Sequence, residues 1–202
     1  MSSRDSGGDR AHRYHATALR MLAKLSAGDS RQKTLHELRT HLRRLQAYLE
    51  LVGEDQNAKV MARCVSKLSR LRTLQVFERY LSRLGSPKSD LRKIKVLIRS
   101  VRAKLERKQR YQTIERLVRY HALPPTPARH DWLAHRMAAL SRANADALRR
   151  MIVETADHPR RKALHALRLK VKAIRYQEEW ALGRPFARPD LVSQLKQAQA
   201  VL

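Results

Sequence analysis

Glycine and proline divide the sequence into a few long uninterrupted segments, and this division constrains the fold more than any other feature. Gly28, Gly53 and Gly85 each follow a long stretch without either residue, and prolines gather at 124–127 and 185–189. Because glycine favours the C-terminal end of a helix and an interior proline breaks it, the segments between these breaks are predicted to be helices. They are rich in Leu, Ala, Arg and Lys, and only 5% of the chain is aromatic, which leaves little material for a sheet. We therefore expect an all-α protein.

Long helices with short connections are predicted along the whole chain. Their approximate ranges are 10–27, 31–52, 56–84, 87–121, 128–157, 159–182 and 190–202. Asp29 or Ser30 can cap the second helix and Ser86 the fourth, because short polar side chains accept hydrogen bonds from free N–H groups at a helix start. Such helices are typical of antiparallel bundles. We expect the small, polar residues 1–9 to be disordered and residues 10–202 to form a single helical domain.

The chain carries a large excess of positive charge. Its 202 residues include 44 Lys plus Arg against 18 Asp plus Glu, which gives a formal net charge of +26. Hydrophobic residues make up 43% of the chain, enough for a packed core, so wholesale disorder is excluded. Because like charges repel one another in a compact chain, an anionic partner is the simplest explanation for a stable fold.

The single cysteine, the first residues and the lengths of the apolar runs indicate the cellular compartment. Cys64 is the one cysteine and cannot form an internal disulfide, and its apolar neighbours indicate a small core residue. The first residues lack the charged, apolar and small-residue succession of a signal peptide. No apolar run approaches the roughly 18 residues needed to cross a bilayer. We therefore expect a soluble cytoplasmic protein without a membrane partner.

An internal repeat links the helices predicted at 31–52 and 159–182. Residues 35–43, Leu-His-Glu-Leu-Arg-Thr-His-Leu-Arg, align with residues 164–172, Leu-His-Ala-Leu-Arg-Leu-Lys-Val-Lys, at an offset of 129. Leu, His, Leu, Arg, an aliphatic residue and a final base fall in the same register. We interpret the two helices as equivalent elements of two related halves, of which the second is shorter.

Basic residues occupy one stripe of each repeated helix. At 100° per residue, the stripe is about 100° wide and borders a band of apolar residues. In the later helix the stripe contains His165, Arg168, Lys172, Arg175, Tyr176 and Glu179, beside Leu164, Leu167, Val171 and Ile174. In the earlier helix it contains His36, Arg39 and Arg43, beside Leu35, Leu38, Leu42 and Leu45, with Arg44 further round. If a pseudo-twofold axis relates the halves, the two stripes converge on a shared groove.

Such a groove suits phosphate. Arginine has a planar fork that matches phosphate oxygens, lysine adds a point charge, and histidine gains charge as the pH falls toward about 6. The alternative is a solvated face whose aliphatic stems cover apolar surface. We favour the groove because the pattern occurs twice and borders the core.

The candidate residues follow from these stripes and from two weaker basic rows. The candidate phosphate ligands are His36, Arg39, Arg43, Arg44, His165, Arg168, Lys172, Arg175 and Tyr176. A possible extension of the anion surface consists of Arg63, Lys67, Arg70, Lys95 and Arg99. Tyr176 could donate a hydrogen bond or simply pack, and Glu179 is expected to orient Arg175, four residues earlier.

Two motifs carry a resemblance to a known family. His36-x-x-Arg39-x-x-x-Arg43-Arg44, preceded by Gly28-Asp29, and His165-x-x-Arg168-x-x-x-Lys172-x-x-Arg175-Tyr176-x-x-Glu179 resemble the two signature helices of the CHAD family, the histidine-bearing α-helical domain. The resemblance implies two pseudo-symmetric helical bundles with a basic central groove. It further implies binding of inorganic polyphosphate, targeting to polyphosphate granules, no catalysis and no cofactor.

The chain also departs from the family pattern. Gln46 stands where family members usually have Arg, and Thr73 and Gln75 stand where a similar segment has Asp. Losing two acids raises the local positive potential and removes carboxylates that could fix neighbouring arginines. Either the second half is truncated naturally, or the helix predicted at 190–202 is completed by another chain.

Two other functions fit the charge less well. The first is nucleic-acid binding, because counterion release favours the binding of a basic protein to any polyanion. However, the sequence has no helix-turn-helix with a glycine turn, no zinc-ligand spacing and no aromatic-rich strand, so we expect nucleic acid to bind only non-specifically. A phosphate- or polyphosphate-metabolising enzyme would need a metal-holding acidic cluster or a glycine-rich phosphate loop, and the sequence has neither. The remaining histidine pairs, His12 with His15 and His130 with His135, are interpreted as surface or core residues instead of metal ligands.

The sequence favours no oligomeric state and does not distinguish long-chain polyphosphate from shorter phosphate polymers or inositol polyphosphates.

Overall fold

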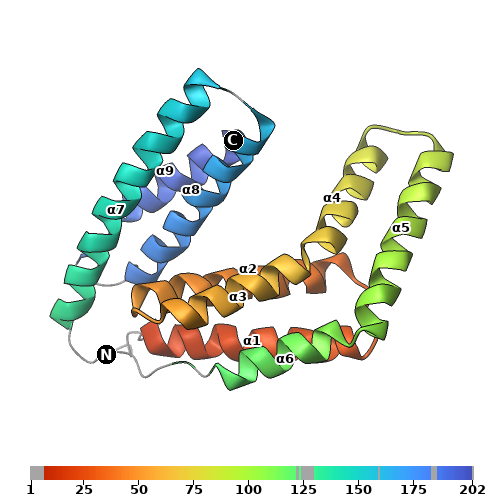
Figure 1. Cartoon of the computed structure of the whole chain (residues 1–202), viewed down its shortest axis with the longest axis horizontal. Helices are drawn as coiled ribbons and strands as arrows, with labels where there is room; N and C mark the ends of the chain where they lie inside the picture. Colours follow the sequence, from red (N-terminus) through yellow and green to blue (C-terminus); the bar gives the residue numbers. More distant parts are fainter. Residues whose placement is uncertain (1–6, 122, 124–129, 159, 183–185, 202) are drawn as a thin grey trace. The chain divides into compact units, whose positions relative to one another are not determined.

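The computed structural model describes residues 7–121, 123, 130–158, 160–182 and 186–201. These residues form helices and no strand, which confirms the predicted all-α class (Figure 1). The helices are α1 (Gly7–Ser26), α2 (Gln32–Leu51), α3 (Asp55–Lys67), α4 (Ser69–Arg83), α5 (Lys88–Arg107), α6 (Arg110–Tyr120), α7 (His130–Asp157), α8 (Arg161–Ala181) and α9 (Pro189–Val201). The first begins three residues earlier than predicted.

The described residues belong to two compact units. Unit 1 draws them from Met1–Ala11, Gln46–Ala58 and Pro124–Leu202, and unit 2 draws them from His12–Leu45 and Lys59–Leu123. The units are therefore not two successive halves of the sequence, because α1, α2 and α3 each contribute residues to both. The pseudo-symmetry of the halves stays a prediction.

The helix predicted at 56–84 is broken at Leu68, so it forms α3 and α4. The N–H of Leu68 donates to the carbonyl oxygen of Val65 at 3.2 Å, three residues back, and the hydroxyl of Ser69 donates to the same oxygen at 3.1 Å. A serine that bonds a carbonyl four residues earlier competes with the regular helical pattern. Neither proline nor glycine marks the break, so it could not be predicted from the breaking residues alone.

The helix predicted at 87–121 is also divided, into α5 and α6. Gln109 lies between them with a φ of 48°, in the left-handed region, and its N–H donates to the carbonyl oxygen of Glu106 at 2.8 Å. A side chain in this region is unfavourable, and glycine is the residue that usually signals such a turn. After the turn, α6 buries Tyr111, Ile114 and Val118.

Unit 2 is built around the apolar band of α2. Leu35, Leu38, Leu42 and Leu45 are each at most 1% exposed, which confirms the predicted core band. α5 contacts both α4 and α6. The ring of His15 on α1 bonds the carbonyl oxygen of Val118 on α6 at 2.9 Å, so these two helices lie side by side (Figure 1). Cys64 is fully buried, and burial raises the pKa of its thiol to about 11, as expected for a core residue.

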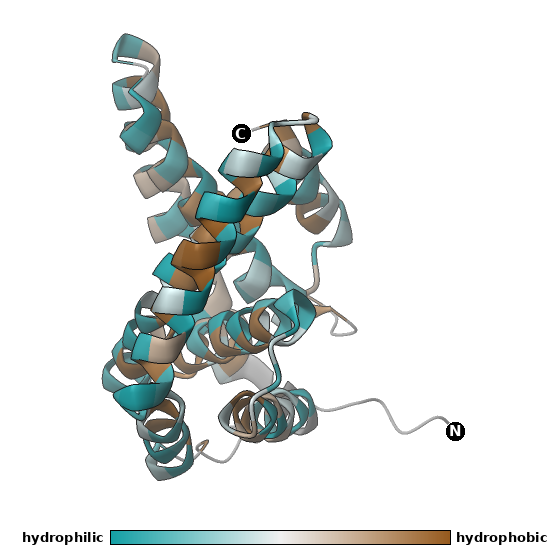
Figure 2. Ribbon diagram, turned by 90° about the vertical axis from the view of Figure 1, so that its right-hand side faces the viewer, coloured by the Kyte–Doolittle hydropathy of each residue, from teal (hydrophilic) through white to brown (hydrophobic). Residues whose placement is uncertain are grey.

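Unit 1 is built around α8, which contacts both α7 and α9. Val171 and Ile174 pack with Leu195 in a common cluster, and Leu167 is also buried. Leu164 is 37% exposed, so its predicted place in the core band is wrong: it lies in the first turn of α8, before the buried residues begin. Figure 2 shows that the helices carry apolar and polar residues side by side, as the amphipathic pattern predicts.

A buried polar network joins the helices of unit 1. Glu178 on α8 has a side chain only 3% exposed, and it pairs with the guanidinium of Arg188, whose Nε donates to Glu178 Oε2 at 3.2 Å. The hydroxyl of Ser141 on α7 also donates to Glu178, at 3.1 Å. Asn144 donates to Gln177 at 2.8 Å, and Gln177 donates to Glu50 at 2.7 Å. These bonds fix α8 against α7 and against the end of α2.

Among the helices that the structure describes, none is both long enough and apolar enough to cross a membrane.

Replacing Arg188 with alanine should destabilise unit 1. The change leaves the Glu178 carboxylate buried without its cation. The expected cost is about 1–3 kcal/mol of unfolding free energy, because Arg188 is itself partly exposed and the Ser141 hydroxyl still donates to Glu178. Arg149→Ala is the matched control, because Arg149 pairs with Asp146 on the exposed surface of α7 and should lose about 0.5 kcal/mol or less. Urea unfolding followed by circular dichroism measures both, and equal losses would contradict the account of the network.

Candidate anion-binding sites

The predicted phosphate ligands of unit 2 lie on α2 in different environments. His36 is exposed, whereas Arg39, Arg43 and Arg44 are partly buried. Arg39 reaches the junction of α3 and α4, where its Nη1 donates to the carbonyl oxygen of Val65 at 3.3 Å and to Ser69 Oγ at 3.0 Å. Arg39 therefore holds the broken helix in place as well as carrying charge.

Like charges crowd around Arg39. Burial, followed by repulsion from Arg43 and Arg72, lowers the pKa of Arg39 to about 10. Arg72 comes from α4, and its Nη1 is buried without a hydrogen-bond partner. Burial and the nearby Arg79 lower the pKa of Arg72 as well. We name Arg39, Arg43 and Arg72 the Arg39 cluster. An anion bound to this cluster would relieve the repulsion among the arginines and supply acceptors for their buried N–H groups.

Arg72 was not among the residues predicted from the sequence. It lies in the segment where Thr73 and Gln75 replace acidic residues of the resembling family segment. Thr73 is exposed and Gln75 is buried, and neither carries a charge that could balance a neighbouring arginine. The absence of acids beside Arg72 was the one signal in the sequence that could have identified it.

Arg44 is engaged with α1. Its Cζ lies 4.9 Å from the ring centroid of Tyr14, whose ring centroid lies 5.2 Å from that of His41. Burial and the charge of Arg44 lower the pKa of His41, which favours the neutral imidazole. This arrangement agrees with the predicted position of Arg44 further round the helix.

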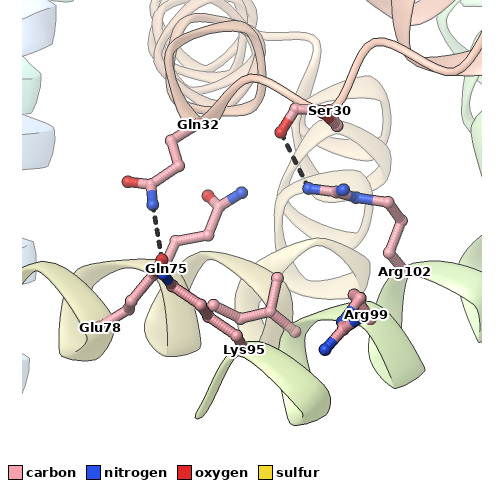
Figure 3. Close-up of a pocket in the computed structure, with 8 residues that line it drawn as sticks. Ser30, Gln32, Gln75, Glu78, Lys95, Arg99 and Arg102 are labelled. Atoms are coloured by element: carbon pink, nitrogen blue, oxygen red, sulfur yellow. Dashed lines mark hydrogen bonds between the residues drawn. The ribbon is translucent and has the colours of Figure 1, made fainter. Parts of the chain in front are cut away.

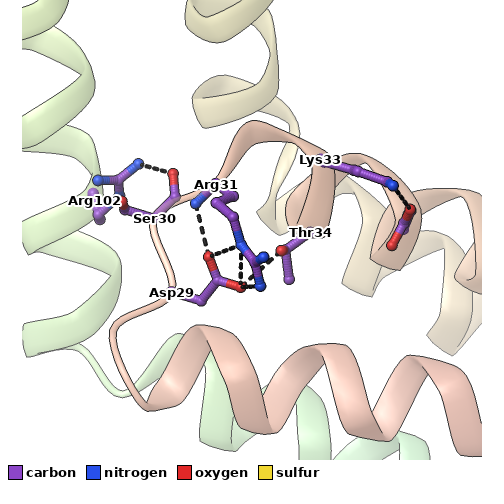
Figure 4. A network of polar contacts seen from close by, with 7 residues as sticks. Asp29, Ser30, Arg31, Lys33, Thr34 and Arg102 are labelled. Carbon is purple, nitrogen blue, oxygen red and sulfur yellow. Dashed lines mark hydrogen bonds and ion pairs between the residues drawn. The ribbon is translucent and has the colours of Figure 1, made fainter.

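The turn before α2 is held by Asp29. Its carboxylate accepts hydrogen bonds from the backbone N–H of Arg31 at 2.9 Å, from the Arg31 guanidinium and from Thr34 Oγ1 at 2.8 Å (Figure 4). These bonds, chiefly those from Arg31, keep the pKa of Asp29 well below its usual range. Gly28 beside it has a φ of 89°, which suits glycine. The motif residues Gly28 and Asp29 thus set the direction in which α2 begins.

The predicted ligands of unit 1 lie along α8. His165 and Arg168 are exposed, Lys172 and Arg175 are partly buried, and Tyr176 is only 3% exposed. The ring of Tyr176 lies under both bases: Arg175 Cζ is 4.7 Å and Lys172 Nζ is 5.6 Å from its centroid. The Tyr176 ring thus packs against two cations and holds them next to each other.

Glu179 lies beside Arg175, as predicted. The distance from Arg175 Nε to Glu179 Oε1 is 3.5 Å, and both side chains are largely buried, at 16% and 21% exposure. Arg175 is therefore close to both the Glu179 carboxylate and the Tyr176 ring, although its buried Nε has no hydrogen-bond partner. That Glu179 orients Arg175 stays a prediction.

Of the two weaker basic rows, one is split between two helices and the other stays on a single helix. The row through Arg63, Lys67 and Arg70 does not follow one helix, because α3 ends at Lys67 and Arg70 lies on α4. Lys95 and Arg99 on α5 both line two hollows of unit 2, with volumes of about 460 Å³ and 230 Å³. Figure 3 shows the larger hollow, where these bases lie near α4 and the start of α2.

Within the described ranges, no group of three or more His, Cys, Asp or Glu residues is placed to hold a metal ion. His12 and His135 are exposed and His15 is partly buried, while the side chain of His130 lies outside the described residues. Comparisons of the chain with protein-family models, with curated proteins and with solved structures found no match. The resemblance to the CHAD family and the shared groove both stay predictions.

The Arg39 cluster should make the protein more stable in the presence of pyrophosphate. A ligand at 100 times its dissociation constant stabilises the folded state by about 2.7 kcal/mol. Arg72→Gln should remove at least half of this gain, whereas Arg116→Gln on the exposed face of α6 should leave it intact. Thermal unfolding in pyrophosphate and in sodium chloride of equal ionic strength tests this, and an equal gain in both variants would place the anion elsewhere.

Proposed function

We propose that the protein binds inorganic polyphosphate without transforming it, through the basic residues of α2 and α8. The observation that carries the proposal is the Arg39 cluster, in which burial, followed by repulsion from Arg43 and Arg72, lowers the pKa of Arg39 to about 10. A crowded group of partly buried cations is an arrangement that a multivalent anion stabilises.

Polyphosphate matches the chemistry of both sets of ligands. Each phosphate of the chain offers oxygens to the guanidinium forks of Arg43 and Arg72 in unit 2, and to Lys172 and Arg175 over the Tyr176 ring in unit 1. A polymer presents many equivalent phosphates, so each unit can bind its own stretch of chain. The exposed His36, His165 and Arg168 add donors along the same helices.

The resemblance of the two motifs to the CHAD family supports the same conclusion. It adds the expectation that the protein associates with polyphosphate granules in the cytoplasm. A tagged copy should coincide with granules in a polyphosphate-accumulating cell and disperse when the polymer is removed. No cofactor is part of this proposal, and the bases act as ligands instead of catalysts.

Charge reversal on both motif helices should abolish polyphosphate binding. We choose Arg43→Glu with Arg168→Glu, because Arg39 also bonds Val65 and Ser69 and its loss would disturb the junction of α3 and α4. Affinity for long-chain polyphosphate, measured by fluorescence polarisation, should fall by about tenfold or more, since several phosphate contacts are replaced by repulsion.

The matched control is Arg116→Glu with Arg142→Glu, which lowers the net charge equally at exposed positions of α6 and α7. It should weaken binding by about threefold or less, because distant exposed charges are screened. Equal losses in the two pairs would mean that bulk charge, and not the motif helices, binds the polymer. Rapid phosphate release from polyphosphate with Mg²⁺ would overturn the non-catalytic proposal.

A further inference from the structure

The larger hollow of unit 2 has two chemically different sides. It has a volume of about 460 Å³ and lies between the start of α2, α4 and α5 (Figure 3). This volume falls within the roughly 300–1,000 Å³ of small-molecule sites. Its rim is fixed by Arg102, which donates to the carbonyl oxygen of Ser30 at 2.8 Å, and by Gln32, which donates to Glu78 at 2.9 Å.

One side of the hollow is basic and continues along α5. Lys95 and Arg99 line both this hollow and the smaller one of about 230 Å³, which Lys88 and Arg92 also line. Four bases from one helix therefore form a continuous row from one hollow to the next. Such a row fits a short chain of phosphates, since each base can contact a separate phosphate group.

The other side of the hollow offers acceptors. Gln75 on α4 is 1% exposed, and its side-chain oxygen has no hydrogen-bond partner. Figure 3 shows its amide extending between Gln32 and Arg102. Glu78, one turn further along α4, adds a carboxylate, and the buried side chain of Ile98 forms an apolar wall. Buried acceptors are normally satisfied, so this side calls for a ligand with donors of its own.

Inorganic polyphosphate does not meet that requirement, because its chain oxygens accept hydrogen bonds. A nucleoside carries ribose hydroxyls and base amino groups that donate, together with a flat apolar ring. Carboxylates are known partners of ribose hydroxyls. A nucleoside joined to a phosphate chain therefore combines the donors for Gln75 and Glu78 with the anions for Lys95 and Arg99.

We propose that unit 2 binds a nucleoside di- or triphosphate in this hollow. The nucleoside occupies the larger hollow against Ile98, with hydroxyl or amino groups donating to Gln75 and Glu78. The phosphates lie along α5 over Lys95 and Arg99. Of the motif helices, only Gln32 at the start of α2 borders the hollow, and none of the candidate phosphate ligands on α2 and α8 lines it. The site can therefore be tested separately from polyphosphate binding.

Calorimetric titration of the full chain with ATP, and separately with inorganic tripolyphosphate, tests the site. The comparison is made in the Arg43→Glu, Arg168→Glu background, which reverses two of the proposed polyphosphate contacts, and the variants below are made in the same background. There ATP should bind about tenfold more tightly than tripolyphosphate, because only ATP satisfies the buried acceptors. Lys95→Ala with Arg99→Ala should weaken ATP about tenfold or more, by removing two charged contacts. Gln75→Leu should weaken ATP about three- to tenfold and change tripolyphosphate by about twofold or less.

The matched control is Lys104→Ala with Arg107→Ala, which removes two exposed charges from the end of α5 outside both hollows. It should change ATP affinity by about twofold or less. Circular dichroism checks that each variant is folded. In the Arg43→Glu, Arg168→Glu background, tripolyphosphate binding as tightly as ATP would overturn the proposal. Equal losses in the control and in the Lys95 and Arg99 pair would also overturn it.

Discussion

The repulsion among the three arginines of the Arg39 cluster is the constraint on which the account of unit 2 depends. The buried leucines of α2 fix this helix in the core, and the helix carries Arg39 and Arg43 with it. Arg72 is added from α4, and burial together with neighbouring cations lowers the pKa of Arg39 to about 10. Packing of the apolar band therefore holds together like charges that would separate in an unfolded chain. The repulsion lowers the stability of the fold, and a bound multivalent anion would offset this loss.

The same helices use their cations for structure as well as for charge. Arg39 donates to the carbonyl oxygen of Val65 near the end of α3, and Arg175 lies over the ring of Tyr176 and close to the carboxylate of Glu179. Bases held in this way lose little conformational freedom when they bind a phosphate, because their orientation is already set. In the proposed function, a small part of the net charge is therefore enough to bind the polymer.

Most of the helices and the core band of α2 could be predicted from the sequence, because glycine, proline and leucine mark them directly. The breaks at Leu68 and Gln109 could not, since they depend on a serine bonding Val65 and on a glutamine in a left-handed conformation. Arg72 was missed because its role comes from contact between α4 and α2, and a helical wheel describes one helix at a time. The pairing of Arg175 with Glu179 was predictable, because it lies within one turn of α8.

Competition between polyphosphate and duplex DNA tests the central claim most directly. Labelled polyphosphate is bound to the protein and displaced by unlabelled polyphosphate or by DNA, at matched phosphate concentration and at several salt concentrations. If arginine clusters on α2 and α8 recognise a flexible phosphate chain, polyphosphate should displace the label at much lower concentrations than DNA, and the difference should persist as salt weakens both. Displacement by DNA as effective as displacement by polyphosphate would contradict the account, because bulk positive charge would then explain the binding.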